Sequence, residues 1–206
     1  MSEIAIIDYG MGNLRSVQKA LARVGATAAI TREPARIAAA AGVVLPGVGA
    51  FGACMDNLRA FNLVEPITRV IAQHTPFLGI CLGMQLLFDE SEEFGPVPGL
   101  GIFRGRVVRF TDPNLKIPHM GWNQIRKTQA LPHLAGIPDG AFVYFVHSYY
   151  VVPADPALAA TTTEYGLPFA SAIARDNVFA CQYHPEKSQD VGLAILRNFA
   201  AVVAGR

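Results

Sequence analysis

The sequence predicts an α/β fold, with a central, mostly parallel mixed sheet and helices on both of its faces. In the first half of the chain, short apolar runs alternate with segments whose apolar residues recur at helical spacing. Continuous apolar strands are typical of a parallel sheet that is buried on both faces. No linker, repeat or low-complexity tract divides the chain, so we expect one domain over residues 1–206.

The first half of the chain predicts three buried strands, each followed by a helix. Gly10-Met11-Gly12 ends the first strand, and Gly25 occupies the position of a helix C-cap glycine. Pro46-Gly47-Val48-Gly49 ends the second strand, and the third strand runs directly into a helical pattern. The predicted elements are strands at 4–7, 43–45 and 76–80 and helices at 14–24, 55–71 and 84–88.

The second half predicts mainly strands and one closing helix. Two strands flank Arg175-Asp176-Asn177 and are expected to form a hairpin, and the helix begins near Ser188, a favourable N-cap. The predicted strands are at 106–110, 122–126, 141–152, 159–163, 170–174 and 178–183. The apolar face of the helix consists of Leu193, Leu196, Phe199 and Val203.

The composition excludes several classes of protein. The chain has 206 residues, with 17 Lys plus Arg against 16 Asp plus Glu, a net charge of +1. A non-specific nucleic-acid binder needs a clustered excess of cations, which this sequence lacks. Apolar residues make up 51% and charged residues 16%, which excludes a disordered chain.

Three features predict a cytoplasmic protein that is not bound to membranes. The N-terminal residues lack the basic start and apolar stretch of an export signal. The uncharged segment 37–55 contains Pro46 and four glycines, a poor composition for a membrane helix. The odd number of cysteines, three, without Cys-x-x-Cys spacing, favours reduced thiols over a disulfide framework.

Gly79-Ile80-Cys81-Leu82-Gly83 joins a buried strand to a helical pattern and has the form of a nucleophile elbow with a thiol. The glycines permit a sharp turn that presents the Cys81 side chain in a cleft. A helix N-terminus at this point stabilises a thiolate, and the N–H of Leu82 points to where an oxyanion forms. Cys54 lies in the helical pattern that continues through Met55, and Cys181 lies in a predicted strand; both are interpreted as packing residues.

Gln182-Tyr183-His184-Pro185-Glu186 carries a candidate base and its orienting acid. Residues two apart in extended chain point to the same side, and Pro185 favours an extended conformation at His184. Glu186 can therefore bond one nitrogen of His184 and leave the other free as a base. Together with Cys81 these residues predict a nucleophilic triad. The glycine-rich turn at 46–49 can supply a second oxyanion donor.

Other patterns are weaker. Gly10-Met11-Gly12-Asn13-Leu14-Arg15 begins like a dinucleotide fingerprint but lacks its third glycine, so we expect no nucleotide cofactor. The five histidines show no metal-ligand spacing, so we expect no metal. His74 and His133 are expected at the surface.

The sequence resembles, over essentially its whole length, the class I, triad-type glutamine amidotransferase domain. The resemblance rests on three motifs in the family's order, which are the glycine-rich turn at 46–49, the Gly-x-Cys-x-Gly segment and the His-Pro-Glu triplet. It implies a three-layer fold. Three further segments are similar to glutaminase subunits of a synthase in histidine biosynthesis. They are Asp8–Leu14, Pro118–Asn123 and Phe145–Tyr149.

The resemblance implies hydrolysis of glutamine to glutamate and ammonia through a thioester on Cys81, with His184 moving protons and Glu186 orienting it. It implies oxyanion contacts at Leu82, Val48 and Gly49. The residues that it implies in glutamine binding are Gly49, Gln85, His147 and Ser148.

The resemblance also implies a partner, a (β/α)₈-barrel cyclase subunit that receives the ammonia, with the two chains forming a heterodimer. The isolated glutaminase is then expected to be nearly inactive until the cyclase subunit has bound the cyclase's own ligand. Rotation of a peptide group in the 46–49 turn is one physical route for this activation. The candidate contact residues are Asn13, Trp122, Tyr144 and Lys187.

Three alternatives remain open at this stage. The first is an amidotransferase of the same class that serves another acceptor. Only the Pro118–Asn123 segment distinguishes it from the histidine-biosynthesis subunit. A cysteine peptidase or stress protein of related fold leaves His184 and Glu186 without an explanation. A silent binding subunit is disfavoured because all three triad positions are filled.

Overall fold

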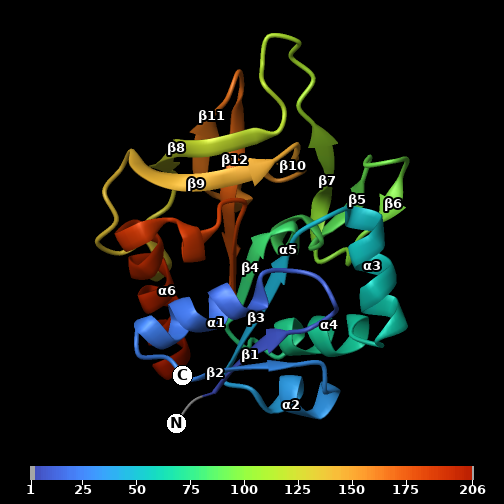
Figure 1. The fold of residues 1–206 in the computed structure, drawn as a ribbon, viewed down its shortest axis with the longest axis vertical. Helices are drawn as coiled ribbons and strands as arrows, with labels where there is room; N and C mark the ends of the chain where they lie inside the picture. The colour runs from blue at the N-terminus through green and yellow to red at the C-terminus, as the bar shows by residue number, and fades with distance from the viewer. Residues whose placement is uncertain (1–2, 206) are drawn as a thin grey trace.

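The computed structural model describes residues 3–205 and confirms the predicted α/β fold with a central mixed sheet. Nine strands form this sheet in the order β2-β1-β3-β4-β13-β12-β11-β8-β9. The pairs from β2 to β13 are parallel, and the pairs from β13 to β9 are antiparallel. A smaller sheet, β10-β7-β5-β6, lies beside it (Figure 1).

The elements have the following bounds. The strands of the main sheet are β1 (Ile4–Ile7), β2 (Ala28–Thr31), β3 (Gly42–Gly47), β4 (Phe77–Cys81), β8 (His119–Lys127), β9 (Ala141–His147), β11 (Ala159–Glu164), β12 (Pro168–Arg175) and β13 (Val178–Cys181). The smaller sheet contains β5 (Phe88–Ser91), β6 (Val97–Pro98), β7 (Phe103–Arg109) and β10 (Tyr149–Pro153). The α-helices are α1 (Leu14–Arg23), α2 (Pro34–Ala39), α3 (Phe51–Ala60), α4 (Val64–Ala72), α5 (Leu82–Gln85) and α6 (Gln189–Ala204), and the 3₁₀ turns are η1 (Pro132–Leu134), η2 (Pro156–Leu158) and η3 (Pro185–Lys187).

Two apolar cores lie on opposite faces of the sheet. On one face, α1 and α6 pack together and bury Val17, Leu21, Leu196 and Phe199. On the other face, α2, α3 and α4 bury a second set that includes Leu58 and other apolar side chains. The sequence alternation of strand and helix thus produces three layers (Figure 1).

The structure divides two predicted elements. The helix expected over 55–71 is α3 and α4, separated at Asn62, whose φ of 55° belongs to the left-handed region that Asn tolerates. The strand expected over 141–152 is β9 and β10, because at Ser148 the chain leaves the main sheet and joins the smaller one. This change of sheet brings Ser148 to the edge of the cavity described below.

The helix predicted at 84–88 is wrong. Only Leu82–Gln85 is helical, and Phe88 already begins β5. Met84, Leu86 and Leu87 are all completely buried. A continuous apolar run shows neither the helical nor the strand period, so the sequence could not distinguish the two here.

His133 corrects a second expectation. Its side chain is buried, with 8% exposed, and its ring stacks on Phe179 at a centroid distance of 4.7 Å. The η1 turn packs against α6, where the Asn198 side chain donates to the His133 carbonyl. His74 is exposed, as predicted.

No helix within residues 3–205 has both the length and the apolar character that a membrane span requires. The N-terminal segment interpreted above as lacking an export signal includes Met1 and Ser2, which lie outside the described residues.

Candidate active site

Cys81 lies at the sharp turn between β4 and α5. Its φ is 55° and its ψ is −112°, a conformation that side-chain-bearing residues rarely adopt. Strained backbone of this kind persists where the surrounding structure fixes it, and it is common at active sites. The turn projects the Cys81 side chain beyond the end of the strand, where 7% of the residue is exposed.

The two glycines around Cys81 allow the chain to pack closely at this turn. A Cβ on Gly83 would overlap the carbonyl oxygen of Leu45 on the neighbouring strand β3. A Cβ on Gly79 would lie 2.9 Å from the Cβ of Ala180 on β13. The Gly-x-Cys-x-Gly pattern therefore reflects close contact with both adjacent strands. The helix that follows is a single turn, α5, shorter than the sequence pattern indicated.

His184 and Glu186 form a buried pair in the segment that leaves β13. Nδ1 of His184 lies 2.8 Å from Oε1 of Glu186, and their side chains are 2% and 1% exposed. Nε2 of His184 has no hydrogen-bond partner. Burial lowers the pKa of His184, but the neighbouring Cys81 sulfur and the Glu186 carboxylate outweigh it and raise this pKa to about 10.

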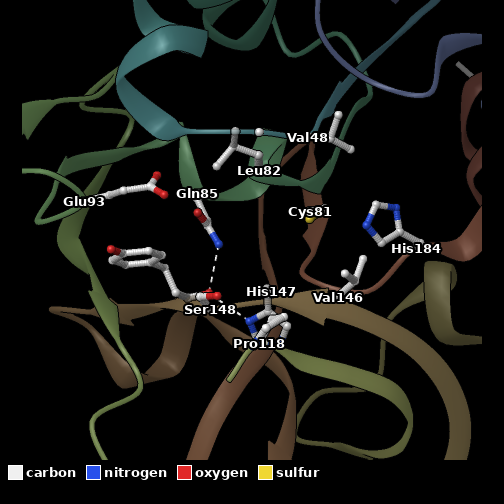
Figure 2. Close-up of a pocket in the computed structure, with 12 residues that line it drawn as sticks. Val48, Cys81, Leu82, Gln85, Glu93, Pro118, Val146, His147, Ser148 and His184 are labelled. Carbon is white, nitrogen blue, oxygen red and sulfur yellow. Dashed lines mark hydrogen bonds between the residues drawn. The ribbon is translucent and has the colours of Figure 1, made fainter. Parts of the chain in front are cut away.

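These groups meet at one cavity of about 360 Å³. Figure 2 shows the His184 ring and the Glu93 carboxylate on opposite sides of the Cys81 sulfur. Strand register explains the meeting, because Gly47 pairs with Cys81 and the last residue of β13 pairs with Ile80. The lining residues are Val48, Gly49, Cys81, Leu82, Gln85, Glu93, Pro118, Val146, His147, Ser148, Tyr149 and His184.

Two side chains donate hydrogen bonds to the glycine-rich turn after β3. The Tyr9 hydroxyl donates to the Pro46 carbonyl at 2.8 Å, and the buried Cys54 thiol donates to the Val48 carbonyl at 3.6 Å. Cys54 therefore contacts the turn as well as packing within α3. Gly49 has a φ of 99°, which glycine adopts readily. The turn borders the cavity beside Leu82.

A hydrogen-bond network forms the cavity wall opposite this turn. Nε2 of Gln85 donates to the Tyr149 carbonyl at 3.0 Å and to Oε1 of Gln182 at 2.9 Å. Nδ1 of His147 lies 2.8 Å from the same carbonyl, which can only accept, so Nδ1 carries the proton. Burial lowers the pKa of His147 to about 3, and its ring is neutral at pH 7. Nδ1 of His119 donates to Nε2 of His147 at 3.0 Å.

Sequence reasoning missed three polar residues of this site, Glu93, Tyr149 and Gln182. Glu93 lines the cavity, and its Oε2 accepts from the Phe51 N–H at 2.6 Å at the start of α3. No sequence pattern singles out a glutamate in this turn. Gln182 donates to the Cys81 sulfur, and its position two residues before His184 could have placed it on the same side of the chain.

Three of the four predicted contact residues lie together. Trp122 and Tyr144 are paired across β8 and β9 with ring centroids 6.0 Å apart, and Nζ of Lys187 lies 5.9 Å from the Tyr144 ring centroid. Met120 and Phe142 on the same two strands are 61% and 54% exposed. We name Met120, Trp122, Phe142 and Tyr144 the β8–β9 face. Asn13 is exposed at the start of α1, outside this face.

Within residues 3–205, no group of three or more His, Cys, Asp or Glu side chains is placed to hold a metal ion, and all three cysteines are free.

Comparison with known proteins identifies the family. The model of the class-I glutamine amidotransferases matches residues 5–203. A curated relative from Syntrophotalea carbinolica, imidazole glycerol phosphate synthase subunit HisH, is 58% identical over 95% of this chain and 98% of its own length. The corresponding protein of Geobacter sulfurreducens is 54% identical over 97% and 98%.

Solved structures agree on the fold. A glutamine amidotransferase crystal structure has a TM-score of 0.76 at 16% identity and covers 98% of this chain and 99% of that one. A chain of the PurLQS structure from Thermotoga maritima has a TM-score of 0.75 at 14% identity, over 98% and 97%. The chain belongs to the class I glutamine amidotransferases and, within them, to the HisH subunits of imidazole glycerol phosphate synthase.

Proposed function

We propose that this chain is a glutaminase that hydrolyses glutamine to glutamate and ammonia, as the ammonia-producing subunit of imidazole glycerol phosphate synthase in histidine biosynthesis. The observation that carries this proposal is the convergence of Cys81 and the His184–Glu186 pair on one cavity. The high identity to HisH subunits supports this acceptor pathway over another amidotransferase pathway. We place the protein in the cytoplasm.

The reaction begins with Cys81 and His184 as a thiolate and an imidazolium. The Cys81 sulfur attacks the side-chain amide carbon of glutamine and forms a tetrahedral intermediate. His184 gives its proton to the departing nitrogen, and the C–N bond breaks. Ammonia is released, and a γ-glutamyl thioester remains on Cys81. A water molecule then gives one proton to His184 and attacks the thioester. The C–S bond breaks and restores the Cys81 thiolate, and the γ-carboxylic acid gives its remaining proton to solvent as glutamate leaves. Glu186 holds the ring in position throughout.

The oxyanion of each tetrahedral intermediate needs hydrogen-bond donors close to the former carbonyl oxygen. The Leu82 N–H and an N–H of the turn at Val48 and Gly49 lie beside the cavity and are proposed as these donors. One such donor commonly contributes about 3 kcal/mol to transition-state stability. Rotation of a peptide group in this turn is the proposed switch between idle and active states.

Glutamine is proposed to lie across the cavity with its amide at Cys81. Gln85, Gly49, His147 and Ser148 are the proposed binding residues. Glu93 adds a carboxylate at the opposite end, where it suits the α-ammonium group of the amino acid.

The subunit name of the relatives implies a partner chain, and we propose that it is a (β/α)₈-barrel cyclase in a heterodimer. Ammonia is largely protonated in neutral water and is then no nucleophile, so a closed passage between subunits preserves its reactivity. The β8–β9 face supports this proposal, since exposed aromatic side chains are enriched where proteins dock. Lys187 beside Tyr144 and the exposed Asn13 are further proposed contacts.

Replacement of the nucleophile tests the proposed reaction. Cys81→Ala is expected to abolish glutamine-dependent synthesis by the assembled synthase and to leave synthesis from added ammonium salt intact. The matched control is Cys181→Ala, which removes another buried thiol and is expected to retain glutamine-dependent synthesis. Loss of the ammonium-dependent reaction in Cys81→Ala would mean that this residue serves folding or assembly.

The partner dependence has its own measurement. Glutaminase turnover is expected to rise by orders of magnitude when the cyclase and its ligand are added to this chain. Full turnover in the isolated chain would contradict gating and favour an independent cysteine hydrolase. Absence of turnover in both conditions would favour a silent binding subunit.

A further inference from the structure

The sulfur of Cys81 has a second polar neighbour besides the His184 ring. Nε2 of Gln182 lies 3.6 Å from Sγ of Cys81, within hydrogen-bonding distance for a sulfur acceptor. Gln182 is completely buried. Burial of an amide is costly unless its polar atoms are bonded, so this orientation is strongly constrained.

Strand register places Gln182 at this position. Cys181, the last residue of β13, pairs with Ile80 on the parallel strand β4. The next residues along the two strands, Gln182 and Cys81, therefore lie side by side at the carboxyl ends of adjacent strands. The Gln182 backbone N–H donates to the Ser171 carbonyl at 2.8 Å and fixes the residue against β12.

The surrounding groups determine which end of the Gln182 amide faces the sulfur. The Tyr149 carbonyl can only accept, so Gln85 must present its NH₂ group there. The same NH₂ group lies 2.9 Å from Oε1 of Gln182, which must then be the acceptor. The NH₂ group of Gln182 is left to face Cys81, because the opposite orientation would bring two donors together.

We propose that Gln182 is a second hydrogen-bond donor to the reacting sulfur, which stabilises the Cys81 thiolate and directs it toward the cavity. A donor favours the charged form of an acceptor, and a hydrogen bond to a charged group is stronger than one between neutral groups. In this arrangement His184 supplies the mobile proton, and Gln182 supplies a fixed dipole that stays in place during the reaction. This role rests on the proposed glutaminase function.

Two variants separate donation from packing. Gln182→Met keeps the length of the side chain and removes the donor. Gln182→Glu keeps the shape and the acceptor oxygen for Gln85, but it places a carboxylate beside the sulfur. The control is Thr161→Val, which breaks the buried Thr161–Ser171 hydroxyl contact on the adjoining strands without touching the amide.

The first readout is the pH dependence of Cys81 alkylation by iodoacetamide in the full chain, followed at this cysteine by peptide mass spectrometry. Gln182→Met is expected to move the midpoint upward by about one pH unit, and Gln182→Glu further, because its charge repels a thiolate. Thr161→Val is expected to keep the wild-type midpoint. A wild-type midpoint in Gln182→Met would overturn the proposal, since a merely structural side chain of this shape gives that result.

The second readout is glutaminase kinetics in the assembled synthase. Gln182→Met is expected to lower kcat about tenfold with little change in KM, because the lost interaction acts on the nucleophile. Ammonium-dependent synthesis reports whether the variant folds and assembles, and where Gln182→Met fails that check, Gln182→Glu decides. The proposed function fails if the wild type hydrolyses no glutamine, whereas the alkylation profile still tests Gln182.

Discussion

At the scale of single residues, the pKa of His184 depends on its charged neighbours, Cys81 and Glu186. A histidine whose pKa is raised on folding stabilises the folded state fully below its unfolded pKa of 6.5, and this stabilisation is lost as the pH rises toward about 10. Glu186→Gln removes one cause of the raised pKa. The decline in unfolding free energy between pH 6.5 and 10 is therefore expected to be shallower in Glu186→Gln than in the wild type.

Urea unfolding at several pH values measures this difference, and comparison of the two chains cancels the titration of lysines and tyrosines elsewhere. Parallel profiles would mean that the His184–Glu186 contact does not change the charge of the ring. Glu186→Gln is also expected to lower kcat, because a His184 ring without its orienting carboxylate rotates away from the cavity.

Residue patterns in the sequence predicted part of this site. The thiol between two glycines and the His-Pro-Glu triplet depend on local backbone geometry, which residue spacing reveals. Cys81 and His184 line one cavity, and Glu186 bonds the His184 ring. Glu93 could not be found in this way. It reaches the cavity because the turn between β5 and β6 lies beside the start of α3, and this contact joins residues 42 positions apart.

At the scale of elements, the elbow depends on close packing between β3, β4 and α5. Gly83→Ala is expected to lower the unfolding free energy by about 3 kcal/mol, because its Cβ would overlap the Leu45 carbonyl and the backbone must move. Gly52→Ala is the matched control. It lies within α3 with ordinary contacts to Val97, so it is expected to be neutral or slightly stabilising.

Equilibrium unfolding in urea provides the measurement for both glycine variants. Equal stability of Gly83→Ala and the wild type would show that the elbow tolerates a side chain and that the glycine pattern has another cause.

The elements that sequence analysis missed are short or lack a pattern. β2, with the sequence Ala-Ala-Ile-Thr, and the six-residue helix α2 follow one another closely, and each carries a single large apolar residue, Ile30 and Ile37 respectively. β5 and β6 gain their stability from pairing with each other and with β7, which local sequence does not encode. The long apolar strands and α6 were predictable because each buries a continuous surface.

At the scale of the whole molecule, the β8–β9 face at one edge of the main sheet is the surface expected to dock with a partner. Trp122→Ala is expected to weaken binding to the cyclase by about 2 kcal/mol, or about thirtyfold in Kd, since large aromatic side chains dominate such contacts. The control is Val152→Ala on the smaller sheet, another exposed apolar residue.

Isothermal titration of the purified chains gives both affinities. Unchanged binding in Trp122→Ala together with weaker binding in Val152→Ala would move the docking surface to the smaller sheet.

The position of β13 within the sheet also affects biosynthesis of the protein. This strand lies between β4 and β12, yet the residue that faces the sulfur follows Cys81 by 101 positions. Cys81 therefore leaves the ribosome long before Gln182 and His184 have been translated. The growing polypeptide carries this thiol without its folded neighbours until the last segment emerges, so the site can form only when synthesis is almost complete.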